Sequence, residues 1–211
     1  LSVVTSGYFL GFLSGARLTP GLIRRVGHVR VFAALGSFMS AGLIAFTLLA
    51  EPWAWTLLRI LVGFCMSGIY VTAESWLNNA SSNETRGKVL SAYMIAQTLG
   101  IIGAQGLLTL GDAATSALFI GASILVSVSF APILLSVSPA PAVEVARPMS
   151  LGRMFASSPL GAVGIFLLGG VYATQSGMGA VFGSQIGLSA DRIALFVAML
   201  FAGALVLQYP V

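Results

Sequence analysis

Long apolar runs separated by short polar gaps constrain the fold of this chain more than any other feature. A helix of about 20 apolar residues crosses the hydrocarbon core of a bilayer, which is roughly 30 Å thick. Charged residues make up 8% of the 211 residues and hydrophobic ones 57%, which excludes a soluble globular surface. The sequence therefore predicts an all-α membrane protein with about seven transmembrane helices. The runs are 1–16, 31–50, 53–77, 89–110, 116–137, 159–174 and 191–211.

The basic residues predict the sidedness of these helices. Residues 17–30 carry four arginines and the single histidine. Counted outward from this gap, every second gap lies on the same side, and those gaps hold eight of the ten Lys and Arg residues. Short cytoplasmic loops carry an excess of Lys and Arg. We therefore expect 17–30, 78–88 and 138–158 to be cytoplasmic, and the net charge of +4 to reflect sidedness rather than nucleic-acid binding.

The ends of the sequence predict a piece of a longer protein. No Met begins the chain, and the first run, 1–16, is short for a complete span. This run carries Gly7, Gly11 and Gly15 at four-residue spacing, a pattern that lets a neighbouring helix approach closely in lipid.

The run 53–77 is the most informative, because its polar and small residues share one face. At 100° per residue, the positions of Arg59, Gly63, Tyr70 and Glu74 fall within an arc of about 100°. An arginine inside a membrane is costly unless it meets water, a partner or a ligand, or reaches back to the interface. Arg59 is thus either a functional residue or a snorkelling one.

Other polar residues leave binding and packing interpretations open. Gln97 in the run 89–110 requires a partner, which is either a neighbouring helix or a bound solute. Gly100 and Gly103 in the same run favour helix packing, as Gly63 does. Glu74 is placed to meet an arginine of 17–30, as a structural latch or as a proton-binding group.

No reaction chemistry is evident. A single Cys excludes a disulfide within the chain and a metal site built from cysteines, and no Ser-His-Asp set is evident. The chain also has no phosphate-binding glycine loop of the Walker type. We predict no enzyme activity, no catalytic residue, no metal and no cofactor.

Three short motifs resemble the major facilitator superfamily of secondary transporters. Leu22, Arg25, Gly27 and Arg30 match the spacing of the family's loop signature, although Pro20 and Arg24 stand where the family has Gly and Asp. Arg59 and Gly63 resemble its fourth-span signature. Glu84, Arg86 and Gly87 resemble the loop after that span. The Gly-Pro signature of antiporters is not evident.

The resemblance implies a bundle of the family's type, of which this chain covers spans two to eight of twelve. The helical half 1–137 would hold spans two to six, 138–158 would be a cytoplasmic linker, and 159–211 would begin the second half. The implied function is an inner-membrane permease that moves a small solute by alternating access, with a proton or another ion as coupling partner. A non-transporting receptor or scaffold with the same bundle is the alternative.

Within that family, the resemblance gives roles to the polar residues. The candidates for contact with solute or coupling ion are Arg59, Tyr70, Gln97, Tyr172 and Gln175. The candidates for a cytoplasmic latch that stabilises one access state are Arg25, Arg30 and Glu74.

Overall fold

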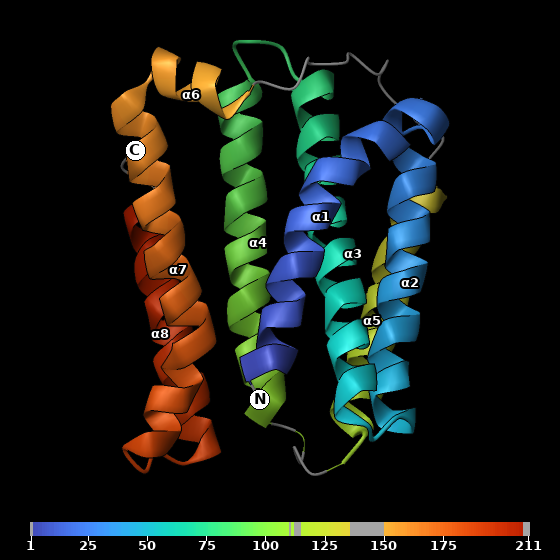
Figure 1. Cartoon of the computed structure of the whole chain (residues 1–211), viewed down its shortest axis with the longest axis vertical. Coiled ribbons are helices and arrows are strands. Elements are labelled where there is room, and N and C mark those ends of the chain that lie inside the picture. The colour runs from blue at the N-terminus through green and yellow to red at the C-terminus, as the bar shows by residue number, and fades with distance from the viewer. Residues whose placement is uncertain (1, 110, 112–114, 136–149, 209–211) are drawn as a thin grey trace. The chain divides into compact units, whose positions relative to one another are not determined.

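The computed structural model describes residues 2–109, 111, 115–135 and 150–208, and every regular element in these ranges is an α-helix (Figure 1). The predicted all-α membrane fold is therefore confirmed. The helices are α1 (Ser2–Val26), α2 (His28–Leu48), α3 (Pro52–Ala80), α4 (Arg86–Thr109), α5 (Ala117–Leu134), α6 (Leu151–Ser157), α7 (Pro159–Gln185) and α8 (Ala190–Gln208).

Several helices are long and apolar enough to cross a membrane. By length and composition these are α2, α3, α4 and α5. A fifth span results if α6 and the first part of α7, which meet at a bend of 117°, count as one. The described residues of α1 and α8 do not meet the same test of length and apolar composition. The structure therefore gives four or five candidate spans, fewer than the seven expected from the apolar runs.

The gap 17–30, predicted as a loop, is almost entirely helical, so the prediction of a loop was wrong. The helix α1 continues to Val26, and α2 begins at His28 after the single residue Gly27. Pro20 lies inside α1, four residues beyond the end of the predicted run 1–16. A proline in a helix removes one hydrogen bond and bends the helix without having to end it, and Figure 1 shows α1 turning towards the start of α2. Gly27 makes the tight turn with φ of 85°, a conformation that glycine adopts readily.

Two further boundaries differ from those predicted. The helix α7 continues to Gln185, although we expected the span to end at Thr174 before a glycine-rich stretch. The gap 78–88 shortens to 81–85, because α3 extends to Ala80 and α4 starts at Arg86. Glycine weakens a helix in water by about 1 kcal/mol. In an apolar environment, however, every backbone polar group must be satisfied within the protein, which favours continued helix.

By its internal contacts the chain forms two compact units. One comprises Leu1–Leu90 with Asp112–Glu144, and the other comprises Ser91–Gly111 with Val145–Val211. The predicted linker 138–158 lies largely outside the described residues, apart from the short helix α6. The predicted division into 1–137 and 159–211 therefore stays a prediction.

The closest helix pair in the first unit is α1 with α3, which meet at glycines on both sides. A Cβ atom at Gly11 would collide with the carbonyl group of Ile60, and one at Gly63 with the backbone of Tyr8. At Gly15 a Cβ would lie 2.5 Å from the carbonyl oxygen of Phe64. The two backbones therefore touch along the glycine stripe of α1, the geometry that small residues permit between membrane helices.

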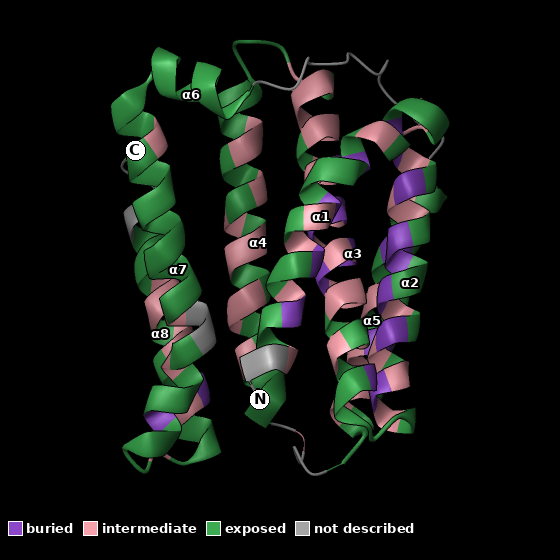
Figure 2. Cartoon of the chain, viewed as in Figure 1, coloured by how far each residue is buried: buried purple, intermediate pink, exposed green. Residues whose placement is uncertain are grey.

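The same unit has a small apolar core on α2, with a polar contact beside it. Residues of α1, α2 and α3 form the core: Ile23, Val31, Leu35, Met39 and Cys65 (Figure 2). On the other side of α2, the hydroxyl of Ser40 lies 2.7 Å from that of Ser123 and 2.8 Å from that of Ser127, both in α5. Hydrogen bonds between membrane helices contribute about 0.6 kcal/mol each on average.

We expect Gly11→Ala to destabilise the protein, because the added methyl group forces α1 and α3 apart. Overpacking of this kind costs roughly 1–3 kcal/mol. The measurement is thermal unfolding in detergent, followed by circular dichroism. Gly21→Ala is the matched control in the same helix, since the nearest atom to its Cβ would be the flexible end of Arg24 at 3.7 Å. Equal unfolding temperatures for the two variants would contradict the backbone contact.

Candidate functional site

Arg59 rests against an aromatic cluster near the start of α3. Its guanidinium carbon lies 5.8 Å from the centre of the Phe46 ring in α2. The Phe46 ring in turn contacts Trp55 edge-on at 5.5 Å and Phe119 of α5 at 5.7 Å. A cation over an aromatic face is stabilised by about 0.5–1 kcal/mol at an exposed position. Since Arg59 remains exposed, its hydrogen-bond donors are not enclosed by this contact.

Tyr70 lies further along α3, where it meets α1. Its ring is 6.4 Å from that of Phe12, in an edge-on contact. It is half-buried, and it is separated from Arg59 by eleven positions, about 16 Å along the helix axis. Arg59 and Tyr70 therefore share a helix without forming one local site.

His28 links the first residue of α2 to the far end of α3. Its side chain is fully buried, its Nε2 lies 3.1 Å from the hydroxyl oxygen of Ser75, and its ring lies 6.0 Å from the Trp76 ring. The Nδ1 atom has no hydrogen-bond partner among the described residues. Sequence reasoning missed this contact, because nothing in a lone histidine indicates a partner 47 positions away.

The His28 contact places the three latch candidates at the same end of the first unit. Arg25 and Arg30 flank His28 in the chain, and Glu74 precedes Ser75. All three are exposed. Within the part of the chain that the structure describes, no ion pair joins Glu74 to either arginine.

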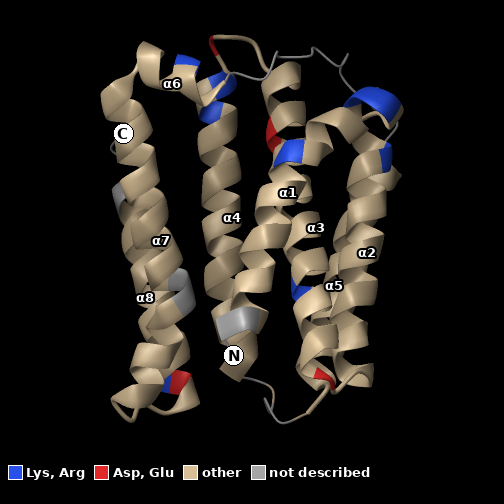
Figure 3. Ribbon diagram, viewed as in Figure 1, with Lys and Arg blue, Asp and Glu red and all other residues tan. Residues whose placement is uncertain are grey.

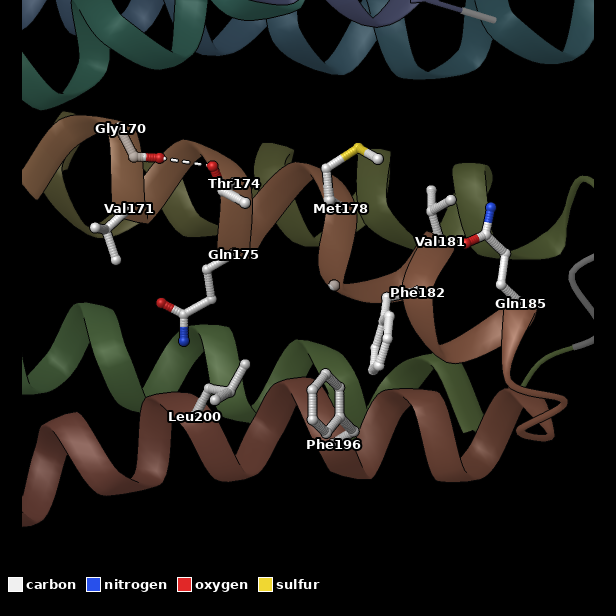
Figure 4. Close-up of a pocket in the computed structure, with 11 residues that line it drawn as sticks. Gly170, Val171, Thr174, Gln175, Met178, Val181, Phe182, Gln185, Phe196 and Leu200 are labelled. Carbon is white, nitrogen blue, oxygen red and sulfur yellow. Dashed lines mark hydrogen bonds between the residues drawn. The ribbon is translucent and has the colours of Figure 1, made fainter. Parts of the chain in front are cut away.

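A pocket of about 960 Å³ lies in the second unit, between α7 and α8 (Figure 4). Figure 4 shows Gln175 and Phe182 extending from α7 towards α8, from which Leu200 and Phe196 extend in return. The hydroxyl of Thr174 donates to the carbonyl oxygen of Gly170 at 2.9 Å. The remaining lining residues are Val171, Met178, Gly179, Val181 and Gln185.

The composition of this pocket is typical of a small-molecule site. Such sites are mainly apolar and aromatic, with a few polar groups that orient the ligand. Here the side-chain amides of Gln175 and Gln185 are the main groups free to donate and accept hydrogen bonds, and none of the described lining residues is charged. Of the predicted solute contacts, Gln175 is the one that lines this pocket.

The remaining predicted residues lie elsewhere in the second unit. Tyr172 is exposed, and its ring contacts that of Phe201 at 6.3 Å. Gln97 is half-buried in α4. At Gly100 and Gly103, also in α4, a Cβ would meet no described atom within 4 Å, so their role in packing stays a prediction. Among the described residues, no group of three or more His, Cys, Asp or Glu side chains is arranged to hold a metal ion.

Comparison with known proteins identifies the family. A family model described as sugar (and other) transporter matches residues 1–143. Among curated proteins, an uncharacterized MFS-type transporter, YcaD, of Escherichia fergusonii is 26% identical over the whole chain, which covers 56% of that relative. YcaD of an Escherichia coli strain gives the same figures. An uncharacterized MFS-type transporter of Enterobacter sp., Ent638_1421, is 32% identical over 48% of this chain and 27% of its own length.

The chain thus spans about half the length of the curated relatives that it matches over its whole extent. No solved structure matches. The family model covers well over half of the chain, and it agrees with the motifs around Gly27, Arg59 and Arg86 and with the helical membrane fold. The chain belongs to the major facilitator superfamily, in its family of sugar (and other) transporters.

Proposed function

We propose that this protein is a secondary transporter that moves a small solute across the bacterial inner membrane by alternating access. Members of its family bind small solutes, and transporters of this type place the solute near the middle of the bilayer between helical repeats. The energy would come from an ion gradient, with a proton as the simplest coupling ion. The alternative is a receptor or scaffold that does not transport, and an absence of transport would favour it.

The pocket between α7 and α8 is the observation that carries this proposal. Its volume of about 960 Å³ is at the upper end of the range for small-molecule sites. Its lining supports an uncharged solute with an apolar body, because Phe182 and Phe196 offer aromatic faces and Gln175 offers both a donor and an acceptor. Gln175 is half-buried, and an amide that a bound ligand covers discriminates against ligands that leave it unpaired.

Arg59 has a separate role in this proposal. It lies in the first unit, and its guanidinium group is oriented by Phe46. We assign it to the coupling step or to a polar group of the solute. Tyr70, Gln97 and Tyr172 are proposed as weaker contacts on the solute's path.

We expect Gln175→Leu to reduce transport by about tenfold. The leucine leaves a polar group of the bound solute without a hydrogen-bond partner, which costs roughly 1–3 kcal/mol. The assay is counterflow of labelled solutes in proteoliposomes of the full-length protein, over neutral amphipathic compounds, sugars, amino acids and anions. Thr98→Val is the control, because it removes a polar group from α4, outside the pocket lining.

Loss of transport in Gln175→Leu, with Thr98→Val unaffected, supports the pocket as a solute site. Arg59→Ala in the same assay tests the coupling assignment, and we expect it to abolish accumulation driven by an ion gradient. If no solute of any class moved in the unsubstituted protein, transport would be contradicted and the receptor or scaffold alternative favoured.

We also propose the latch that Arg25, Arg30 and Glu74 would form in one access state. The His28 to Ser75 contact supports it, because it holds the chain segments of all three residues at one end of the unit. Glu74→Gln should shift the protein towards the other access state. The measurement is labelling of cysteines placed at the two ends of the spans, with Glu84→Gln as the matched control in the exposed turn after α3. Identical labelling of Glu74→Gln and the unsubstituted protein would refute the latch.

A further inference from the structure

The last ten residues of α1, residues 17–26, form a helical segment with three distinct faces. Thr19 and Ile23 are buried against the rest of the first unit. Leu18, Leu22 and Val26 follow at four-residue spacing on a second face, and they are 58%, 37% and 46% exposed. The exposed arginines of the segment, Arg17, Arg24 and Arg25, occupy the remaining side.

This segment lies at the end of the first unit where a membrane span begins. It leads through Gly27 directly into α2, which is long and apolar enough to cross the bilayer. The segment contains Pro20, and Figure 1 shows that α1 bends before it reaches α2. Figure 3 shows basic residues gathered at the turn between α1 and α2. A helix with an apolar face beside a basic one is typical of the membrane interface.

The positive charge of this segment has no partner within the described chain. Residues 17–30 contain no Asp or Glu. Neither Arg24 nor Arg25 forms an ion pair with any described residue. A guanidinium group binds phosphate oxygens through two parallel hydrogen bonds, so a pair of free arginines is chemically matched to a phosphate ester.

We propose that the segment 17–26 binds an anionic phospholipid, with the phosphate at Arg24 and Arg25 and the acyl chains along Leu18, Leu22 and Val26. The exposed apolar face selects a lipid over free inorganic phosphate, because phosphate alone would leave that face uncovered. Sidedness alone explains an excess of positive charge, but it does not require a site that distinguishes one lipid from another. The bound lipid would stabilise the α1–α2 turn on its exposed surface, while the contact of His28 with Ser75 stabilises it within the protein.

Trp76 provides a built-in reporter, because it lies against His28 at this end of the unit. The 211 residues contain three tryptophans, so Trp53→Phe and Trp55→Phe, with replacement of any tryptophan outside these residues, leave Trp76 as the reporter. The full-length protein is placed in bilayers that contain increasing amounts of a brominated phospholipid, which quenches nearby tryptophan. The two arms compare brominated phosphatidylglycerol with brominated phosphatidylcholine.

We expect phosphatidylglycerol to quench Trp76 in a saturable manner at low mole fraction, and phosphatidylcholine only in proportion to its mole fraction. Arg24→Gln with Arg25→Gln should weaken the apparent lipid affinity by about 25-fold, since each arginine near an anionic surface contributes about fivefold. Arg24→Lys with Arg25→Lys retains the charge and should retain most of the binding. Arg192→Gln, a matched change at an exposed arginine of α8 in the second unit, should leave quenching unchanged.

Equal quenching by the two lipids at every mole fraction in the unsubstituted protein would overturn the proposal, whatever the variants do. Relief of the phosphatidylglycerol effect by inorganic phosphate would overturn the lipid assignment and show a simple anion site. Because the lipid comparison needs no substitution in the segment itself, a variant that fails to fold leaves the test decisive.

Discussion

The backbone contact between α1 and α3 is the constraint on which the first unit depends. Lipid chains are as apolar as leucine, so burial of apolar surface does not drive membrane helices together. Association must come from close packing, and Gly11 and Gly63 permit the closest approach that two helices can make. Once α1 is fixed, α3 presents Arg59 towards α2 and Ser75 towards His28. The positions of the Arg59–Phe46 and His28–Ser75 contacts therefore depend on glycines that have no functional side chain.

The two units use their polar residues differently. In the first, polar side chains connect helices: Ser40 bonds to α5, and His28 meets Ser75 of α3. In the second, the amides of Gln175 and Gln185 border an open apolar pocket. Polar groups that are satisfied between helices rigidify a bundle, whereas groups that face a cavity remain available to a ligand. This difference is why we assign the main solute contact to the pocket, beside the separate role of Arg59, and conformational control to the α1–α2 turn.

Much of the fold could be predicted from the sequence, because the apolar runs and the scarcity of charge leave few alternatives. The four-residue spacing of Gly7, Gly11 and Gly15 likewise indicated a close neighbour. The partners could not be predicted. Periodicity shows which face of a helix is small or polar, but not which helix will cover it. The hydrogen bonds of Ser40 to α5 and of His28 to α3 are therefore seen only in the structure. The end of α1 was predicted ten residues too early, because basic residues and a proline are compatible with a helix that bends rather than ends.

The candidate site could be predicted only in part from the sequence, for the same reason. Gln175 was predicted as a polar residue just after the apolar run 159–174. Phe182 and Phe196 are ordinary apolar residues by sequence and become pocket residues only when α7 meets α8. The domain boundary at 138–158 was predicted from the family resemblance, which does not fix which helices of this chain pack together. Contacts between distant segments carry that information.

We propose that the pocket between α7 and α8 opens in turn to the two sides of the membrane. The decisive measurement is labelling of a cysteine at the pocket-lining position of Met178 with a membrane-impermeant maleimide. The background lacks Cys65, the single cysteine of these 211 residues, and any cysteine outside them. Sealed vesicles of both orientations are compared with and without transported solute. We expect labelling from both sides, with a ratio that the solute changes. Labelling from one side alone, unchanged by any solute, would contradict it.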